Sequence, residues 1–179
     1  MTTQNNKISV FILAIIISTG IVASTSLNTA VFAQNATQTN STSVSPQNAN
    51  FTASLSGQNE VPPTQSIANG TADFSPSANQ IAFFMNATNI QNYTAAHIHL
   101  APQGQNGPIV VTLVDFSAPT DQYSLDGNAF TAENLEGPMQ GKQLTDLVSE
   151  MNNGNAYVNI HTTQNPNGEI RGQIIPSNQ

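Results

Sequence analysis

Short runs in which apolar and polar residues alternate fill the chain from Phe51 to Ile175, and breaks rich in Gly, Pro and Asn separate them. Successive side chains of an extended strand point to opposite faces, so this alternation is typical of strands with one buried face. The spacing predicts strands over 51–56, 70–74, 80–86, 94–100, 109–115, near 130, 156–162 and 169–175. About eight short strands at this spacing predict an all-β fold, an antiparallel β-sandwich or barrel.

One helix is expected, over residues 142–152. Its apolar residues recur at i, i+3, i+4 and i+7, and they are Leu144, Leu147, Val148 and Met151. That period places them on one helical face, which we expect to pack on the core, and Gly154 is placed to end the helix. The pair Asp126-Gly127 predicts a tight turn into the strand that carries Phe130.

The first 33 residues have the features of a secretory signal: a polar start, an apolar run from Ile8 to about Ala23, and small residues up to Ala33. We expect cleavage after Ala33. Retention as an N-terminal membrane anchor is the alternative, because the apolar run is close to the length that spans a bilayer. Residues 34–49 are almost all Asn, Thr, Ser, Gln and Ala and predict a disordered linker. The rest of the chain is expected to be secreted or displayed on the cell surface.

The chain is acidic, with a formal net charge of -7 and three basic residues, Lys7, Lys142 and Arg171. Binding to nucleic acid requires clustered Lys and Arg, so nucleic acid is excluded as a partner, and no membrane contact is expected beyond the N-terminal signal or anchor. The expected partner is an unidentified protein or surface ligand. The absence of cysteine excludes disulfides, thiolate metal ligands and a cysteine nucleophile.

An exported chain can be a glycoprotein, and several asparagines precede x-Ser/Thr without an intervening proline. These candidate glycosylation sites are Asn35, Asn40, Asn50, Asn69, Asn86 and Asn92. A chain this rich in Asn and Thr also forms such sequons by accident, which is the alternative interpretation.

All three histidines lie on the polar faces of two predicted strands, His97 and His99 on one and His161 on the other. If the strands are neighbours, the imidazoles converge in a way that is usual for copper or zinc sites, and three nitrogens with an open position would suit Cu(II), Cu(I) or Zn(II). Tyr157 and Asn159 share the face of His161 and are candidates to orient a ligand ring. The alternative is a structural role, in which the histidines bond to turns and hold loop crossings in place.

Three further charged residues stand out in a chain with only 7% charged residues, namely Glu60, Glu169 and Arg171. Glu169 and Arg171 lie two apart on a predicted strand, so we expect a local ion pair, or a pair between Arg171 and Glu60. The functional alternative is that Arg171 attracts a small anion towards a histidine-bound metal. No nucleophile elbow, phosphate loop or paired carboxylate motif is visible, and no catalytic residue is predicted.

Four stretches together resemble the CHRD domain, a family named for the repeated modules of chordin. They are residues 55–63, Ala95-Ala96-His97-Ile98-His99, Asn106-Gly107-Pro108, and residues 157–172 ending in Pro166-Asn167-Gly168-Glu169-Ile170-Arg171-Gly172. The resemblance spans about residues 50–176, the whole predicted globular part.

The resemblance implies an immunoglobulin-like Greek-key sandwich similar to copper–zinc superoxide dismutase. In such enzymes a His-x-His strand and a later histidine hold copper and an arginine guides the anion, which the resemblance assigns to His97, His99, His161 and Arg171. The chain lacks a fourth histidine to bridge copper to zinc, and it lacks the stabilising disulfide. A complete copper–zinc enzyme is therefore excluded. Growth-factor binding is not carried over from chordin, because the cysteine-rich repeats are absent.

Three functions remain open at this point. The first is a secreted or cell-surface, non-catalytic binding module that holds a metal, with copper favoured and zinc as the alternative. The second is a copper-dependent redox enzyme of the superoxide dismutase type. The third is a purely structural or adhesion module of the envelope, in which the histidines have no need to meet.

Overall fold

The computed structural model describes residues 50–121 and 124–177. The predicted signal segment and linker lie outside these residues, as do the sequons at Asn35 and Asn40, and all of these stay predictions. In the part that is described, no helix has both the length and the apolar character needed to cross a membrane.

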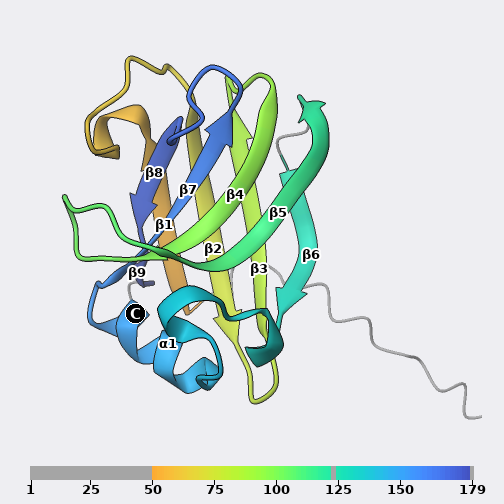
Figure 1. Cartoon of the computed structure of the whole chain (residues 1–179), viewed down its shortest axis with the longest axis vertical. Helices are drawn as coiled ribbons and strands as arrows, with labels where there is room; N and C mark the ends of the chain where they lie inside the picture. The colour runs from red at the N-terminus through yellow and green to blue at the C-terminus, as the bar shows by residue number, and fades with distance from the viewer. Residues whose placement is uncertain (1–49, 122–123, 178–179) are drawn as a thin grey trace, which may run out of the picture. The chain divides into compact units, whose positions relative to one another are not determined.

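Nine strands in the described ranges pair into one antiparallel sheet (Figure 1). They are β1 (Phe51–Ser56), β2 (Asn69–Pro76), β3 (Ile81–Thr88), β4 (Tyr93–Leu100), β5 (Ile109–Thr120), β6 (Ser124–Phe130), β7 (Ala156–Thr162), β8 (Ile170–Gln173) and β9 (Ile175–Pro176). The order along the sheet is β5-β4-β7-β8-β1-β2-β3-β6, and β9 pairs with β1. The β-rich class with one short α-helix is therefore confirmed.

The described strands form one curled antiparallel sheet, and the immunoglobulin-like Greek-key sandwich that the resemblance implied is not shown. The halves β5-β4-β7-β8 and β1-β2-β3-β6 meet where β8 joins β1, and a single residue pair, Ser56 with Arg171, links these two strands. Alternation in a sequence gives the two faces of a strand but not its neighbours. This is why the strands were predicted and their assembly into one sheet was not.

Irregular pairing bends the sheet at its outer strands. The register between β4 and β5 shifts at three places, and the register between β3 and β6 shifts once. In the second case, Met85 pairs with Leu125 but Phe83 pairs with Asn128, so β6 carries one extra residue. Such a bulge increases local twist and curvature. The predicted tight turn at Asp126-Gly127 is therefore wrong, because these residues lie in the bulge of a continuous strand.

The apolar faces of the strands meet inside the curl. Phe74, Phe83 and Phe130 form a row of tilted rings with centroids 6.4 and 6.3 Å apart. Ile98 and Ile160, which alternate with the histidines along β4 and β7, are fully buried in the same core. The face opposite the core is therefore the face on which the histidines lie.

The helix α1 (Leu144–Asn152) lies at one end of the curled sheet (Figure 1). Its predicted apolar stripe packs on the core, and Leu147 and Met151 are fully buried. It begins at Leu144 because the Asp146 carboxylate accepts a hydrogen bond from the Gln143 N–H at 2.9 Å. Gly154 ends it as predicted, with a φ of +68°. Three short 3-10 helices complete the described part: Gly57–Asn59, Ala132–Asn134 and Gly137–Met139.

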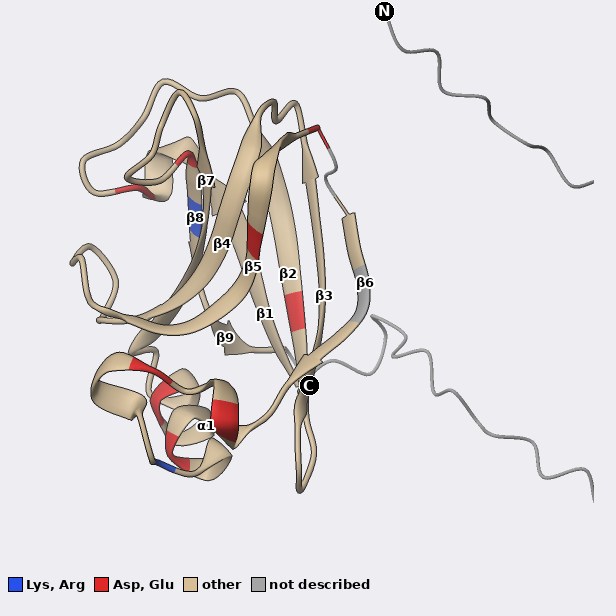
Figure 2. Cartoon of the chain, turned by 45° about the vertical axis from the view of Figure 1, so that its right-hand side comes forward, with Lys and Arg blue, Asp and Glu red and all other residues tan. Residues whose placement is uncertain are grey.

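Polar groups are buried on the outer side of β4, β7 and β8, beneath loops. Glu60, His99, Asn159 and Arg171 are each at most 9% exposed although they do not face the apolar core. In Figure 2 the blue of β8 marks the one basic residue of the sheet among the described residues, while several of the acidic positions lie on α1 and beside it. A buried polar layer of this kind requires internal hydrogen bonds, and its contacts define the site described next.

Candidate metal centre

The register of β4 and β7 brings the three histidines together. His97 pairs with Asn159 and His99 pairs with Tyr157, while His161 pairs with Ala95, two residues before His97. Diagonal neighbours on one face of an antiparallel pair lie within reach of long side chains. His161 therefore reaches across to His97, as the sequence predicted it would if the two strands were neighbours.

The three imidazoles form one compact cluster. Their potential ligand atoms all lie within 4.8 Å of one another, and the closest pair is His97 Nδ1 and His161 Nε2 at 3.0 Å. The ring centroids of His97 and His161 are 4.8 Å apart, and those of His97 and His99 are 5.8 Å apart. This cluster could hold a metal ion.

Two backbone carbonyls set the tautomers of His99 and His161. His99 Nδ1 lies 2.9 Å from the Gly107 carbonyl oxygen, and His161 Nδ1 lies 3.0 Å from the Pro166 carbonyl oxygen. A carbonyl only accepts hydrogen bonds, so both Nδ1 atoms carry the proton and both Nε2 atoms are acceptors, of which that of His161 faces His97 Nδ1. The Nε2 atom of His99 is buried and no donor lies within hydrogen-bond distance of it, although the nearby Asn159 side chain acts to raise the pKa of the ring.

Burial keeps all three rings neutral at pH 7. It lowers the pKa of His97 to about 4, with smaller contributions from the neighbouring His161 and His99. It also lowers the pKa of His99 and of His161, and the bonds to the carbonyls of Gly107 and Pro166 offset only part of this effect. Neutral imidazole is the form that binds metal ions, so the cluster does not need to lose charge before it binds one.

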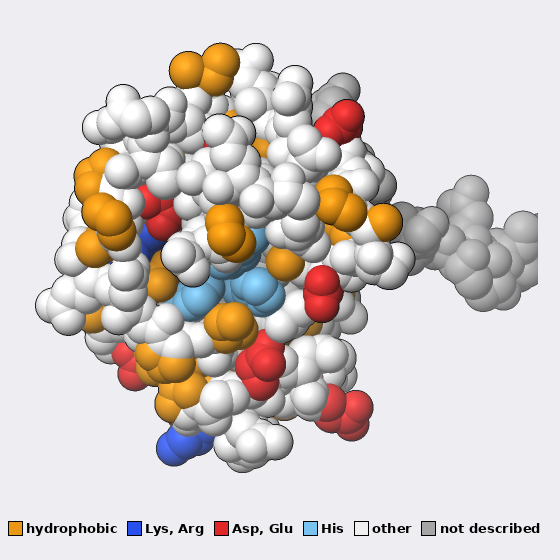
Figure 3. Space-filling view, turned by 45° about the horizontal axis from the view of Figure 1, so that its top comes forward, with side chains coloured by type: hydrophobic (Ala, Val, Ile, Leu, Met, Phe, Trp, Pro, Cys, Tyr) orange, Lys and Arg blue, Asp and Glu red, His pale blue; other side chains and the backbone are white. Residues whose placement is uncertain are grey.

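The spacing of the cluster fits one ion. Nitrogens bound to a single copper or zinc ion at about 2.0 Å lie roughly 3.3–3.5 Å apart. The distances between the ligand nitrogens here range from 3.0 Å up to 4.8 Å, so side-chain shifts of about 1 Å would bring all three nitrogens to the spacing of one bound ion. Figure 3 shows the histidine side chains reaching the surface together in the middle of one face. An ion has a path to the cluster from solvent, and a coordination position would stay open.

The model of the CHRD domain matches residues 51–174, which is nearly all of the described part. The chain belongs to the CHRD domain family. No curated protein and no solved structure matches it. The predicted resemblance is therefore confirmed.

Tyr157 of the CHRD domain supports the cluster from one side. Its ring stacks on that of His99, with centroids 4.8 Å apart and planes 8° apart. Its hydroxyl oxygen accepts a hydrogen bond from the Gly107 N–H at 3.2 Å, while the carbonyl of Gly107 binds His99. Tyr157 and the loop between β4 and β5 thus fix the His99 ring together.

Arg171 is held within the fold of the CHRD domain. Its guanidinium carbon lies 3.3 Å from the centroid of the Tyr157 ring, and its nitrogens donate to Gln105 O at 2.8 Å and to Asn106 Oδ1 at 3.2 Å. The side chain is 2% exposed. These contacts tie Arg171 to the loop that orients His99, and they leave it poorly placed to guide an anion from solvent.

The predicted ion pair between Glu169 and Arg171 is wrong. Glu169 lies just before β8, where the chain has not yet become a strand, so the two side chains do not share a face. Its carboxylate accepts hydrogen bonds from Ser66, from Asn165 and from Thr162, the last at 2.9 Å. These bonds lower its pKa against the effect of burial, which acts in the opposite direction and is the largest single influence.

Glu60 and Asn159 lie close together next to Gly168, and Asn159 pairs with His97 across β4 and β7. Glu60 is 5% exposed, and burial raises its pKa to about 7 although the positive charge of Arg171 pulls the pKa down. Gly168, whose φ is +136°, packs against both: a Cβ there would lie 2.5 Å from Glu60 Oε1 and 2.7 Å from Asn159 Nδ2. The predicted pair of Arg171 with Glu60 is thus an electrostatic interaction between buried groups, and the hydrogen bonds of Arg171 go elsewhere.

Two acidic residues near the cluster were missed in the sequence. Glu136 and Asp115 both act on the charge of His97, raising its pKa, and Thr112, which pairs with His97, donates a hydrogen bond to Glu136 at 2.7 Å. Glu136 follows Leu135, which forms an isolated antiparallel bridge with Val111 of β5, and it lies outside any predicted strand, so strand alternation carries no signal for it. The surroundings of the histidines are therefore anionic.

The candidate glycosylation sites in the described part lie at the surface to different degrees. Asn50, Asn69 and Asn92 are exposed, and Asn86 is half-buried in β3. Their occupancy stays a prediction.

Proposed function

We propose that this CHRD domain is a secreted or cell-surface, non-catalytic binding module that holds one copper ion between His97, His99 and His161. The proposed donor atoms are His97 Nδ1 and the Nε2 atoms of the other two rings. The predicted N-terminal signal supports the location. Copper is favoured over zinc, because neutral imidazoles bind Cu(II) more tightly than Zn(II) in the general order of divalent metals.

The observation that carries the proposal is the Nε2 atom of His99. It is a buried acceptor with no donor within hydrogen-bond distance, Asn159 being its nearest polar influence, and the Gly107 carbonyl holds its ring in the tautomer that directs this lone pair away from that loop. A buried polar atom without a partner costs roughly 1–3 kcal/mol, so a purely structural histidine would be expected to use it. An ion at the cluster would satisfy this atom together with the two neighbouring nitrogens.

A superoxide dismutase activity receives less support. That reaction needs an anion to approach the metal, and the chain provides Asp115 and Glu136 near His97 while Arg171 is buried against Tyr157. Like charges at the entrance slow the association of an anion. The same charges favour the arrival of a cation, which is what a metal-holding module requires.

The test is a titration of the full chain, stripped of metal, with Cu(II), Cu(I) and Zn(II), followed by competition against a chelator of known affinity. We expect one equivalent of copper to bind and zinc to bind more weakly than Cu(II). The His97→Ala/His99→Ala double variant should lose this binding while its circular dichroism spectrum stays that of the parent.

Thr112→Ala is the matched control, because Thr112 lies beside His97 on β5 and offers no imidazole. It should keep the parent affinity for copper. Equal copper binding by the double variant and the parent would overturn the proposal, and the histidines would then be fold residues of a structural or adhesion module. If the copper-loaded chain removed superoxide much faster than the metal-free chain, the superoxide dismutase function would be favoured instead.

A further inference from the structure

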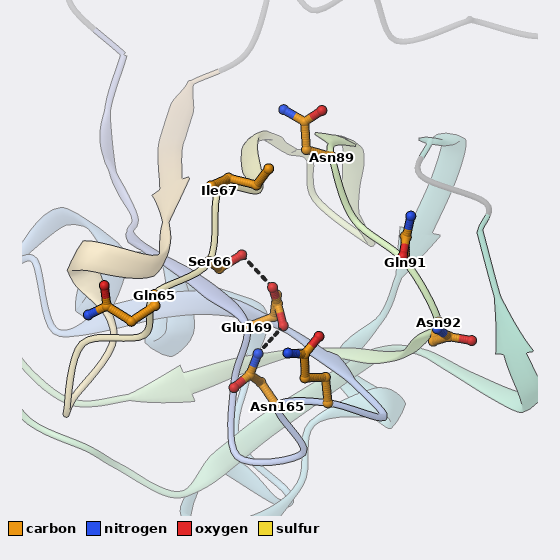
Figure 4. Close-up of a pocket in the computed structure, with 9 residues that line it drawn as sticks. Gln65, Ser66, Ile67, Asn89, Gln91, Asn92, Asn165 and Glu169 are labelled. Atoms are coloured by element: carbon orange, nitrogen blue, oxygen red, sulfur yellow. Dashed lines mark hydrogen bonds between the residues drawn. The ribbon is translucent and has the colours of Figure 1, made fainter.

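A polar pocket of about 380 Å³ opens on the molecule away from any histidine. It lies between three loops: the segment before β2, the β3–β4 loop and the β7–β8 loop. Glu169 lies at its centre with Ser66 and Asn165 bonded to it, and Ile67, Asn89 and Gln91 surround it (Figure 4). Its volume is within the range of pockets that take small molecules.

Hydrogen bonds tie the three walls of the pocket together. The Thr163 N–H donates to the Asn92 carbonyl oxygen at 3.1 Å, which joins the β7–β8 loop to the β3–β4 loop. The Thr64 hydroxyl donates to the Glu169 carbonyl oxygen at 2.9 Å, which joins the segment before β2 to the β7–β8 loop. Asn92 is also held by Asp121, whose carboxylate accepts from its N–H at 3.0 Å. The pocket is therefore largely formed before a ligand arrives, which lowers the entropic cost of binding.

The charge of the pocket favours neither an anion nor a hard metal cation. None of the residues that line it is basic, so nothing there would select an anion. Glu169 is its one carboxylate, and that group already accepts hydrogen bonds from Ser66, Thr162 and Asn165. A hard cation such as calcium needs six or more oxygen ligands, several of them charged, and this lining does not supply them.

Neutral groups that both donate and accept hydrogen bonds dominate the lining. Its carboxamides come from all three loops and are Gln65, Asn89, Gln91, Asn92, Gln164 and Asn165. Ile67 adds an apolar surface beside them and is 77% exposed, the most exposed large apolar side chain of the described residues. A hydroxyl group both donates and accepts, and a sugar ring also carries an apolar face of C–H groups. We propose that this pocket binds a neutral saccharide.

The saccharide has two possible sources. One is a free or cell-surface glycan. The other is a glycan on the chain itself, because Asn92, which lines the pocket, begins the sequon Asn92-Tyr93-Thr94. Both present the same hydroxyl-rich chemistry to the carboxamides, and the experiment separates them.

The experiment measures saturation transfer by NMR from the full chain, produced without glycosylation, to N-acetylglucosamine, glucose and mannose. At least one sugar should receive transfer in a concentration-dependent way. The Gln91→Ala/Gln164→Ala double variant removes exposed carboxamides from two walls and should raise the dissociation constant about tenfold or more. Gln140→Ala removes an exposed carboxamide that does not line the pocket and should leave the dissociation constant unchanged.

The second arm uses the chain secreted from a host that glycosylates Asn-x-Thr sites. A glycan on the peptide containing Asn92, with loss of transfer to free sugar that Thr94→Val restores, would identify the chain's own glycan as the occupant. Unchanged transfer in that material would identify a free glycan. Transfer to none of the three sugars from unglycosylated chain, or equal transfer from the double variant, would overturn the proposal.

Discussion

At the scale of single residues, His97 differs from the other two histidines of the cluster. The Gly107 and Pro166 carbonyls fix the tautomers of His99 and His161, whereas the ring of His97 bonds to the lone pair of His161 Nε2. In the metal-free chain His97 Nδ1 must therefore carry the proton of this bond. If an ion were held at His97 Nδ1, that proton would have to move, through solvent, to the Nε2 atom of the same ring.

Gly168 provides the first prediction, since it packs where no side chain fits. Gly168→Ala should destabilise the metal-free chain by about 2–4 kcal/mol, because the new Cβ would meet Glu60 and Asn159 in addition to the strain of a positive φ. Gly104→Ala is the matched control, since Gly104 has a φ of +80° and no atom within 4 Å of an added Cβ. It should cost only about 1 kcal/mol. Urea unfolding of the two variants measures the difference, and equal losses would contradict the packing described here.

Glu60 provides the second prediction, on pH. Burial raises its pKa from 4.5 in the unfolded chain to about 7 in the folded chain, so the folded state holds this proton more tightly. The contribution of protonated Glu60 to stability is complete below pH 4.5 and is lost as the pH rises to about 7. Glu60→Gln should therefore gain stability relative to the parent between these values, by up to about 3 kcal/mol.

Unfolding of metal-free parent and variant in urea, across this pH range, measures the change. The exposed Glu133→Gln variant controls for the loss of one negative charge. A difference between Glu60→Gln and the parent that stays constant with pH would show that Glu60 is ionised in the folded chain.

At the scale of elements, the loop between β4 and β5 is a support for the centre. Asn106 accepts from Arg171 and donates to the Val61 carbonyl oxygen at 2.7 Å, and the next residue, Gly107, holds His99. Asn106→Ala should lower copper affinity about tenfold although Asn106 offers no ligand to the ion, which is typical when the partner of a ligand is loosened.

The competition titration with copper measures this effect. Gln103→Ala changes an exposed side chain of the same loop and is the matched control, with affinity expected to stay that of the parent. If Asn106→Ala kept full affinity, the loop would have no part in orienting His99.

The sequence predicted the strands and the faces of the histidines because both follow from a period of two. It predicted the contact between His97 and His161 only on the condition that β4 and β7 pair. The alternation of apolar and polar residues does not determine which strands pair or in which register. The predicted ion pair of Glu169 with Arg171 was wrong for a related reason, because β8 begins one residue after Glu169. The saccharide pocket had no signal in the sequence at all, as its walls come from three loops far apart along the chain.

At the scale of the whole molecule, charge is sparse and mostly negative, with -7 as the formal net charge. Asp115 and Glu136 add a local negative field at the histidines. Acidic side chains are visible on the same face as the histidines in Figure 3. The Asp115→Asn/Glu136→Gln variant should bind Cu(II) about two- to tenfold more slowly than the parent at low salt. The two rates should converge at about 1 M salt, where the Debye length falls to about 3 Å.

Stopped-flow mixing measures these rates. The Glu133→Gln/Glu150→Gln variant removes the same number of charges from the region around α1 and should retain the parent rate. A parent rate that does not change with salt would show that the field of the molecule has no part in metal capture.

The 3.0 Å contact between His97 and His161 has a consequence for what a partner could sense. A proton occupies the middle of the cluster in the metal-free chain. If the proposed ion binds, that proton would move across one ring, and the bonds of the other two rings to Gly107 and Pro166 would not need to change. The domain would then hold the ion without a change of fold. The surface shape of the domain would be the same in both states. A partner protein could then distinguish the metal-bound from the metal-free domain only through the ion itself, by accepting the ion or by exchanging an electron with it.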